Sequence, residues 1–464
     1  MNSILPGTFS NENQVQSKVD NFFKQYSIGN LLRRSNFNKE SGFPCLQIFK
    51  FIFMLIFTGK NLYRVLQADS VGGLPAKDVY YNFLKSTSYN WRKFLLALSS
   101  LIIRETVSTL TSDEREKVLI FDDSLFSRNR SKAVELLARV FDHTEKKYMR
   151  GFRMLTLGWS DGNTFLPLSF SLLSSEKKEN RLNEVNPSID KRTNGYKLRK
   201  ESMKKTTEVM FELLDQLAPY GVSAKYLLFD SWFAYPKVIR KVLERNLHAI
   251  CMLKSMPKVL YQYMDKPMNL VELYNYIYKK PGKAKILASV VVELGKDKQE
   301  HPVKVKIVFV RARNKSRKWL AILSTDITLP DEEVIRIYGK RWDIEVFFKM
   351  SKSYLKLAKE FQSRSYDSMV AHTTIVFCRY IMLALESRNS RDPRTIGNLF
   401  YLCCDELQDI SFSHALFLLF DLLKDSLRKH LLISGKKLEE FLNQFITSLP
   451  MFFKDRLLIS MSES

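Results

Sequence analysis

The sequence has few of the residues that mark common metal and redox sites. Its five cysteines form no CxxC pair, and its six histidines form no HExxH or HxH pattern. An odd number of scattered cysteines argues against a disulfide framework or a zinc site. Any metal would therefore need oxygen ligands, which are the ligands that magnesium and manganese prefer.

Glycine-rich phosphate loops and membrane spans are also missing. The sequence contains no Walker loop and no GxGxxG motif. Its most apolar run, 46–58, includes Lys50 and is shorter than the roughly 20 apolar residues that cross a bilayer. Because this run does not follow a basic N-terminus, it is not a signal peptide. We interpret it as a buried helix and expect a cytoplasmic protein without a membrane partner.

Positive charge is what the sequence has in excess. Among its 464 residues, 73 are Lys or Arg and 49 are Asp or Glu, so the formal net charge is +24. Nucleic acid is the default partner of such a chain, and an anionic membrane surface is the alternative. The apolar share of 45% predicts a folded protein. The length predicts about two to four units instead of one core.

Residues 1–112 are predicted to form a helical region in which basic and aromatic residues alternate. The expected helices are 17–27, 45–57, 60–68, 77–85 and 90–109. One interpretation is a bundle with a solvated basic face. The other, which the net charge favours, is a DNA-binding bundle.

Short apolar strands alternate with helices between residues 113 and 255. Strands are expected at 117–124, 152–160, 165–173, 225–230 and 248–255, and the turn signal Asp161-Gly162 joins two of them. Helices are expected at 131–139, 206–219 and 235–246. The basic segment 174–205 is predicted to be a mobile loop that orders on a phosphate backbone, or else a solvated loop.

The remainder divides into a β-rich and a helical part. Residues 256–326 contain three runs that alternate like antiparallel strands, after a helix near 269–278. Helix resumes from about 331, and most of the chain from 366 to the end is predicted to be helical. The Leu- and Phe-rich segment 414–423 is a candidate dimer contact.

Residues 337–352 are predicted to form one helix with its polar groups on a single strip. At about 100° per residue, the side chains of Tyr338, Arg341, Glu345 and Lys352 share a strip roughly 60° wide. Apolar residues form a neighbouring strip that would face the core. An Arg341–Glu345 pair four residues apart is most often a surface ion pair, so the strip alone does not define a site.

Three acidic positions have the chemistry of a metal site: Asp122 or Asp123, then Asp230, then Glu345. A lone aspartate at the end of a strand is most often a turn or helix cap. Burying a carboxylate at a strand end, however, has a desolvation cost that a nearby cation must offset. Two Mg²⁺ ions, for which Mn²⁺ can substitute, would provide that charge and clamp a phosphodiester between them.

The spacing Tyr338-x2-Arg341-x3-Glu345-x6-Lys352 resembles the Y-R-E-K signature of a large family of bacterial insertion-sequence transposases. These are DDE enzymes with a ribonuclease-H-like catalytic fold. The segments LIFDDS and LLFDSWF resemble the two aspartate blocks of that family. The resemblance covers roughly residues 115–360.

The resemblance implies an α/β fold, with a ribonuclease-H-like mixed sheet, a β-rich insertion, and N-terminal and C-terminal helical regions. The implied divisions are a DNA-binding region at 1–112, catalytic parts at 113–255 and 327–400, the insertion at 256–326, and a C-terminal region at 401–464 that could dimerise.

The resemblance also implies a role for each site residue. Asp122, Asp230 and Glu345 would be the metal-binding catalytic residues. Asp122 fits the D-x-[S/T] pattern, and Asp123 is the alternative, because alternation along a strand lets only one of the two point at the metals. Residues that would bind transposon-end DNA are Tyr338, Arg341 and Lys352. Trp319 matches a tryptophan that stacks on a flipped base, although it could equally be a core residue.

The implied function is cut-and-paste transposition. The protein would bind terminal inverted repeats, hydrolyse a strand at each end, and join the freed 3′ hydroxyl to target DNA. Its partners would be double-stranded DNA and a second copy of the chain on that DNA, at the bacterial nucleoid. The alternatives are a non-catalytic DNA-binding descendant and a structure-selective nuclease of the same fold.

Overall fold

The computed structural model describes residues 14–57, 61–68, 74–112, 115–142, 147–281, 284–311, 319–360 and 363–389, and four isolated positions nearer the C-terminus. The chain forms two units. One comprises residues 1–27, 54–68 and 394–464, and the other comprises 28–53 and 69–393. The predicted C-terminal helical region at 401–464, including 414–423, lies outside the described residues apart from those isolated positions.

The first unit contains helices α1 (Gln14–Gln25) and α4 (Leu62–Ala68). They overlap the predicted helices at 17–27 and 60–68. Within α1 and the turn after it, the rings of Phe22 and Tyr26 pack edge to face, with centroids 5.4 Å apart. This contact is the four-residue neighbour pair that helix geometry produces.

The second unit is built on one 11-stranded mixed sheet. Its first strands are β1 (Val118–Ser127), β2 (Ala138–Asp142), β3 (Lys147–Ser160), β4 (Phe165–Leu173), β5 (Tyr226–Phe229) and β6 (His248–Leu253). Strand β3 pairs antiparallel with β1 and also with β2 and β4, whereas β1, β5 and β6 are parallel. All residues of 118–121 and 226–229 are buried, which explains why these parallel strands are uniformly apolar.

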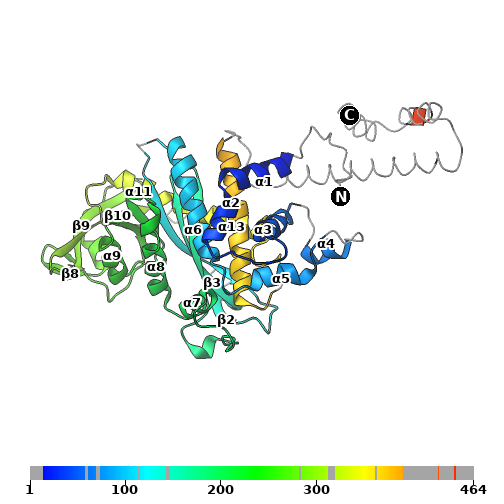
Figure 1. The fold of residues 1–464 in the computed structure, drawn as a ribbon. Coiled ribbons are helices and arrows are strands. Elements are labelled where there is room, and N and C mark those ends of the chain that lie inside the picture. The colour runs from blue at the N-terminus through cyan, green and yellow to red at the C-terminus, as the bar shows by residue number, and fades with distance from the viewer. Residues whose placement is uncertain are drawn as a thin grey trace. The chain divides into compact units, whose positions relative to one another are not determined.

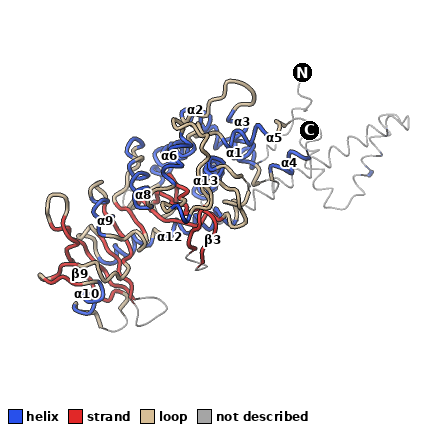
Figure 2. Tube along the Cα trace, turned by 90° about the horizontal axis from the view of Figure 1, so that it is seen from below, coloured by secondary structure: helices blue, strands red, loops and turns tan. Residues whose placement is uncertain are grey.

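The β-rich insertion continues this same sheet. It contains β7 (Tyr261–Tyr263), β8 (Lys266–Met268), α10 (Leu270–Tyr276), β9 (Ile286–Lys296), β10 (Pro302–Arg311) and β11 (Trp319–Ser324). Strand β11 pairs antiparallel with β6, and the order from there is β6-β11-β10-β9-β7-β8. Figure 2 shows these strands extending away from α6 and α13. The predicted α/β class, with a mixed sheet and a β-rich insertion, is confirmed.

Helices flank this sheet (Figure 1). They are α2 (Ile28–Arg34), α3 (Cys45–Met54), α5 (Lys77–Lys85), α6 (Trp91–Ile102), α7 (Asn194–Ser202), α8 (Thr206–Asp215), α9 (Pro236–Leu243), α11 (Asp331–Gly339), α12 (Trp342–Ser353) and α13 (Tyr366–Asn389). Short helical turns occur at Ile103–Val107, Ser108–Leu110, Lys178–Asn180 and Ala218–Tyr220. Helices α6, α7, α12 and α13 contact β4.

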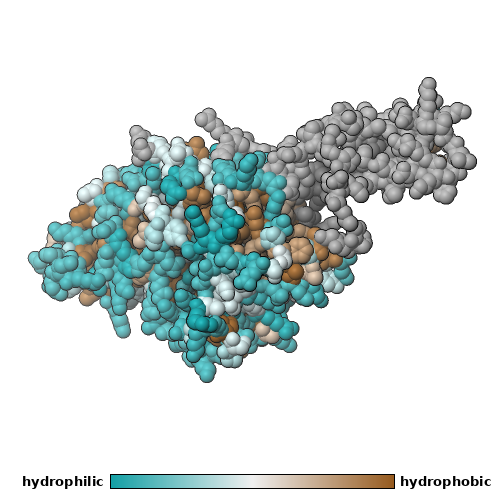
Figure 3. Space-filling model, in the orientation of Figure 1, coloured by the Kyte–Doolittle hydropathy of each residue, from teal (hydrophilic) through white to brown (hydrophobic). Residues whose placement is uncertain are grey.

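Apolar helices supply much of the core. In α3, within the most apolar run of the sequence, Ile48, Phe49, Ile52 and Phe53 are buried, as predicted. Among the described residues, one helix is long and apolar enough to cross a membrane, at Tyr366–Arg388, and its apolar window is fully buried inside the protein. The face of the molecule in Figure 3 is mostly hydrophilic, with apolar patches scattered over it.

The predicted helix at 131–139 is wrong. The chain forms a loop there and then enters β2, which pairs with β3 from Ala138 to Asp142. Leu136 has a φ of 57°, a left-handed conformation that cannot continue a right-handed helix. The apolar residues of this loop, including Val134 and Leu137, are buried by tertiary contacts instead of by a helical face.

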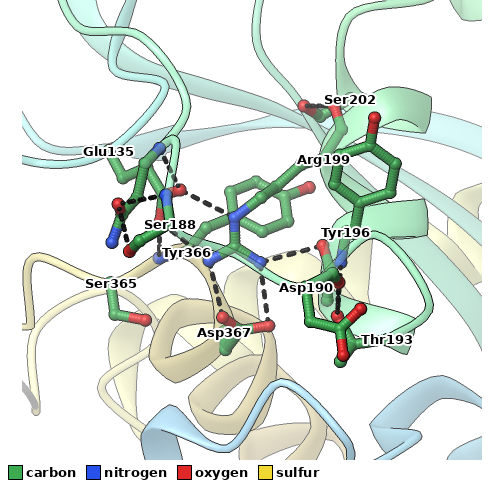
Figure 4. A network of polar contacts seen from close by, with 12 residues as sticks. Glu135, Ser188, Asp190, Thr193, Tyr196, Arg199, Ser202, Ser365, Tyr366 and Asp367 are labelled. Atoms are coloured by element: carbon green, nitrogen blue, oxygen red, sulfur yellow. Dashed lines mark hydrogen bonds and ion pairs between the residues drawn. The ribbon is translucent and has the colours of Figure 1, made fainter.

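The prediction of a loop over the basic segment 174–205 is wrong for residues 194–202, which form α7, whereas 174–193 contains only a short helical turn at Lys178–Asn180. Figure 4 shows Arg199 of α7 between Glu135 and Asp367. The Arg199 side chain is only 2% exposed. Its Nε donates to Glu135 Oε1 at 2.7 Å, and its Nη2 donates to Asp367 Oδ2 at 2.6 Å. We call these three side chains the Arg199 cluster.

The Arg199 cluster explains the glycine that precedes it by one helical turn. The carbonyl of Gly195 accepts a hydrogen bond from Arg199 Nη1 at 2.8 Å. A Cβ atom at Gly195 would lie 2.5 Å from Asp367 Oδ1, which is too close for any side chain. Arg199 is therefore a structural cation that joins α7 to α13, and it is not available to a phosphate.

Candidate active site

A pocket of about 1050 Å³ opens beside the second half of β1, where the pairing of β1 with β5 stops and β5 and β6 end. Its lining includes Asp122, Asp230 and Glu345, the three acids singled out in the sequence. Strands β1 and β5 are in register at Phe121 and Phe229, so Asp122 and Asp230 follow neighbouring residues at the same edge of the sheet. Glu345 reaches the same pocket from α12.

The two adjacent aspartates of β1 face different partners. Asp122 Oδ2 accepts a hydrogen bond from Arg341 Nη1 at 2.7 Å. Ser124, two residues further along the same face, accepts one from Lys352 Nζ at 2.6 Å. Asp123 instead pairs with Arg153 of β3, with a distance of 3.0 Å between Oδ2 and Nε. Asp122 is therefore the aspartate that meets the polar side chains of 338–352, which favours it over Asp123 for the site.

The prediction of one helix over 337–352 is wrong. Helix α11 ends at Gly339, and α12 begins at Trp342. In between, the N–H groups of Lys340 and Arg341 each donate to a carbonyl three residues back, at 3.0 Å. These tight turns separate α11 from α12, although the backbone of Lys340 and Arg341 stays in the right-handed region.

Side chains that the signature does not include hold this break in place. Lys340 Nζ donates to the carbonyls of Glu116 and, at 3.3 Å, Asp161. Asp343 Oδ2 accepts from Ser160 Oγ at 2.6 Å. The start of α12 is thus attached to the β3–β4 hairpin. Sequence reasoning missed Lys340 and Asp343 because only the folded chain brings the hairpin next to them.

Arg341 lies between two of the three acids. In addition to its bond with Asp122, its Nη1 and Nη2 lie 3.3 and 3.4 Å from Glu345 Oε1. The side chains of Arg341 and Asp122 are 12% and 13% exposed, whereas that of Glu345 is 42% exposed. One guanidinium therefore shares its charge between a buried carboxylate and one that reaches solvent.

Burial sets the protonation equilibria of the pocket. Burial raises the pKa of Asp122 to about 7, although Arg341 lowers it, and the charge of Asp123 adds to the increase. Burial also lowers the pKa of Lys352 from its ordinary value. Burial opposes the charge of Arg341, but Tyr338 and Asp122 raise its pKa overall. Near neutral pH, Asp122 consequently exchanges a proton easily while Arg341 stays charged.

Tyr338 lies beside Arg341. The Arg341 guanidinium carbon is 5.9 Å from the centre of the Tyr338 ring. Burial raises the pKa of this phenol, so it stays protonated. Among the described residues its buried hydroxyl donates to no acceptor, and its polar neighbour is the Arg341 guanidinium, which can only donate. A buried donor without an acceptor is uncommon, and it marks a position where a ligand oxygen could bind.

Further cations line the pocket that the signature does not predict: Arg153, Lys254, Lys349 and Lys359. Lys254 follows β6 directly, as Asp230 follows β5. Its signal in the sequence was therefore the same strand-end position that identified the aspartates. Together with Lys352, these side chains surround the acids with positive charge, which suits a phosphate-containing ligand.

Trp319 does not line the pocket. Its ring stacks on Tyr274, with centroids 4.7 Å apart, and meets Phe309 edge to face at 5.2 Å. It is half-buried in this aromatic cluster of the β-rich insertion. This environment fits the core alternative for Trp319, and its stacking on a DNA base stays a prediction.

Oxygen atoms from three carboxylates are a donor set that suits Mg²⁺ or Mn²⁺. In the part of the chain that the structure describes, no three His, Cys, Asp or Glu side chains are grouped at ion-binding distance. Asp122 and Glu345 instead share the Arg341 guanidinium. The side chains fit the ion by their chemistry and their common pocket.

Comparison with known proteins identifies the class to which this fold and pocket are similar. The family described as DDE superfamily endonuclease matches residues 52–269, and the family described as transposase DDE domain matches residues 201–382. The chain is therefore similar to DDE-superfamily transposase domains over residues 52–382.

A solved structure is also similar to the chain. It is a piggyBac transposase synaptic complex with hairpin DNA, determined by cryo-EM, at 12% identity and a TM-score of 0.44. The match covers 97% of this chain and 83% of that one. No curated protein matches the chain.

Proposed function

We propose that this chain is a DDE-type DNA transposase and that its pocket binds the phosphodiester to be cut. The observation that carries the proposal is the meeting of Asp122, Asp230 and Glu345 at one pocket, although each is more than a hundred residues from the next in the chain. The similarity to DDE-superfamily transposase domains supports the same function.

In this proposal Asp122, Asp230 and Glu345 hold two Mg²⁺ ions, for which Mn²⁺ can substitute. When bound, the ions would activate the attacking oxygen and stabilise the leaving oxygen of an in-line displacement at phosphorus. The chain's own part is to hold three carboxylates within strand β1, directly after strand β5 and in the first turn of α12, where regular backbone fixes their separation.

Cationic side chains of the pocket position the DNA backbone. Lys254 and Lys352 line the pocket together with the acids. The Arg341 guanidinium can bind a phosphate through two parallel hydrogen bonds, and the Tyr338 hydroxyl can donate a further one. Holding the phosphates on both sides of the scissile bond brings the reacting atoms into line.

The reaction has two steps at phosphorus. Water attacks the phosphodiester at the element end, the bond to the 3′ oxygen breaks, and a 3′ hydroxyl and a 5′ phosphate are formed. That 3′ hydroxyl then attacks a target phosphodiester, a new phosphorus–oxygen bond forms, and the target's 3′ oxygen leaves. We further propose that the chain belongs to a bacterial insertion sequence of the Y-R-E-K type and acts as a dimer on inverted repeats.

A cleavage assay tests this function. The substrate is DNA carrying the inverted repeats that should flank the gene, incubated with Mg²⁺ or Mn²⁺. We expect a 3′ hydroxyl at the element end, and we expect Glu345→Gln and Asp230→Asn to slow cutting on the order of 10³-fold or more, the loss that several kcal/mol of transition-state stabilisation would cause. Unchanged cutting by Glu345→Gln would overturn the assignment.

A pair of neighbouring variants tests the choice of aspartate. Asp122→Asn should abolish cutting, whereas Asp123→Asn should retain it, because Asp123 pairs with Arg153 and not with the cations of 338–352. The reverse result would assign Asp123 to the metals. The products separate the alternatives: joined molecules indicate a transposase, cutting without joining a nuclease, and binding without cutting a non-catalytic descendant.

A further inference from the structure

Arg341 lies between Asp122 and Glu345, two carboxylates that the proposed function assigns to metal binding. The inference rests on that function. Arg341 Nη1 is 2.7 Å from Asp122 Oδ2 and 3.3 Å from Glu345 Oε1. The bond to Asp122 is buried on both sides, so solvent screens it little. The guanidinium is therefore the cation that these two acids share.

A guanidinium and a divalent ion compete for these oxygens. Mg²⁺ binds carboxylate oxygen at about 2.0–2.1 Å and demands a near-octahedral arrangement of ligands. A positive group hydrogen-bonded to the same oxygens would obstruct that arrangement and repel the ion at short range. Arg341 uses one oxygen of each carboxylate, Asp122 Oδ2 and Glu345 Oε1, so these two oxygens become available to an ion when Arg341 moves away from them.

A DNA phosphate is the partner that can draw Arg341 away. Phosphate accepts the two parallel hydrogen bonds of a guanidinium, and the lysines of the pocket attract the DNA backbone to the same place. Arg341 lies in the tight turn between α11 and α12, so its side chain can turn without unwinding a regular helix. Beside it, the Tyr338 hydroxyl is a donor without an acceptor among the described residues.

We propose that Arg341 is a positioning residue that couples DNA binding to metal loading. Without DNA it occupies Asp122 and Glu345 and weakens metal binding. With DNA it transfers to a phosphate and releases both carboxylates. By linkage, DNA must raise metal affinity by the same factor by which metal raises DNA affinity. One charge-assisted hydrogen-bonded contact gives a factor of about tenfold to a hundredfold.

The experiment measures Mn²⁺ binding by electron paramagnetic resonance, with and without a pre-cut end duplex that terminates in a dideoxynucleotide and so cannot react. For the wild type, DNA should tighten Mn²⁺ binding by about tenfold to a hundredfold. For Arg341→Gln, Mn²⁺ should bind that much more tightly without DNA, and DNA should add little. Arg341→Lys, which keeps the charge, should retain part of the coupling and guards against a misfolded glutamine variant.

Arg153→Gln is the matched control. It removes an equal charge from the lining of the pocket that Arg341 adjoins, but Arg153 pairs with Asp123 and not with the proposed metal ligands. We expect its Mn²⁺ binding to keep the wild-type dependence on DNA. An equal increase in Mn²⁺ affinity for Arg153→Gln and Arg341→Gln would reduce the effect to net charge and overturn the proposal.

DNA cutting and Mn²⁺ binding together distinguish a failure of the coupling from a failure of the proposed function. If the wild type cuts DNA but Arg341→Gln leaves Mn²⁺ affinity without DNA unchanged, the coupling is refuted and the transposase function stands. If Mn²⁺ binds wild type and Asp230→Asn equally, the metal site itself is refuted, and the coupling with it. DNA-dependent Mn²⁺ binding that disappears in Arg341→Gln supports both.

Discussion

Two arginines of this protein each meet two carboxylates, and their surroundings are opposite. In the Arg199 cluster, the guanidinium makes short bonds to Glu135 and Asp367 and a further one to a backbone carbonyl (Figure 4). Beside the pocket, Arg341 makes one short bond, to Asp122, and only long contacts to Glu345.

One acid at each arginine shows the difference, Glu135 and Asp122, although burial also raises the pKa of Asp367 in the Arg199 cluster. Burial tends to raise the pKa of Glu135, yet its bonds to Arg199 hold that pKa below the ordinary value. The pKa of Asp122 is raised to about 7, because Arg341 does not compensate for burial. Where a buried guanidinium makes short hydrogen bonds to both carboxylates, removing it is strongly destabilising. Where burial of a carboxylate at a pocket is only partly offset by its cation, the cation can be replaced by another partner. A guanidinium between two carboxylates thus joins α7 to α13 in the Arg199 cluster, and in the proposed function the corresponding group at Arg341 belongs to the active site.

The largest expected effect comes from removing the two arginines in turn. Arg199→Met would leave Glu135 and Asp367 buried without their cation, and it should lower the free energy of unfolding by about 3–5 kcal/mol. Arg341→Met should change it by no more than about 1 kcal/mol, because Asp122 can take up a proton instead. Urea denaturation of both variants measures the difference. Equal losses of stability would remove the distinction between the two sites.

An intermediate effect is expected from pH. A carboxyl group whose pKa is raised to about 7 holds its proton below that pH, so an incoming metal must displace it. Mn²⁺ affinity should therefore be constant at alkaline pH and fall by about tenfold per unit as the pH drops below 7. Titrations between pH 5 and pH 9 check this. A profile that stays flat down to pH 5 would mean that Asp122 is ionised throughout and that the contrast with Glu135 is absent.

The smallest expected effect comes from an exposed ion pair, which can be compared with the buried Arg199 cluster. Arg192 pairs with Asp190 at 2.8 Å, in the same basic segment as Arg199, but its side chain is 90% exposed. Solvent screens such a pair, so Arg192→Ala should not change the midpoint of thermal unfolding measurably. Calorimetry on this variant beside Arg199→Met tests whether burial, and not ion pairing as such, makes the Arg199 cluster stabilising.

Sequence patterns predicted the acids of the pocket because each has a local signal. Asp122 and Asp230 follow short apolar runs, and Glu345 has the helical spacing of Arg341 and Lys352. Only Asp230 lies at a strand end in the structure, because β1 continues past Asp122 to Ser127. Such signals are local, so a single sequence contains them. The choice between Asp122 and Asp123 needed the fold, since it depends on which face of β1 meets α12.

Pairings between distant residues could not be predicted. Arg199 bonds to residues that are 64 and 168 positions away, and no periodicity relates them. The break before Trp342 has the same origin, because Lys340 and Asp343 bind a hairpin that lies far upstream. Local propensity favoured a continuous helix there, and tertiary contacts overrode it.

The hydrogen bonding of β11 to β6 has a mechanical consequence. The β-rich insertion is not suspended from a flexible tether, because its first paired strand belongs to the sheet whose edge forms the pocket. From β6 to β9 there are three strand spacings, or roughly 14 Å at the usual separation between strands. The insertion is therefore a rigid extension of the sheet. A ligand bound along it would lie at a fixed distance from the carboxylates.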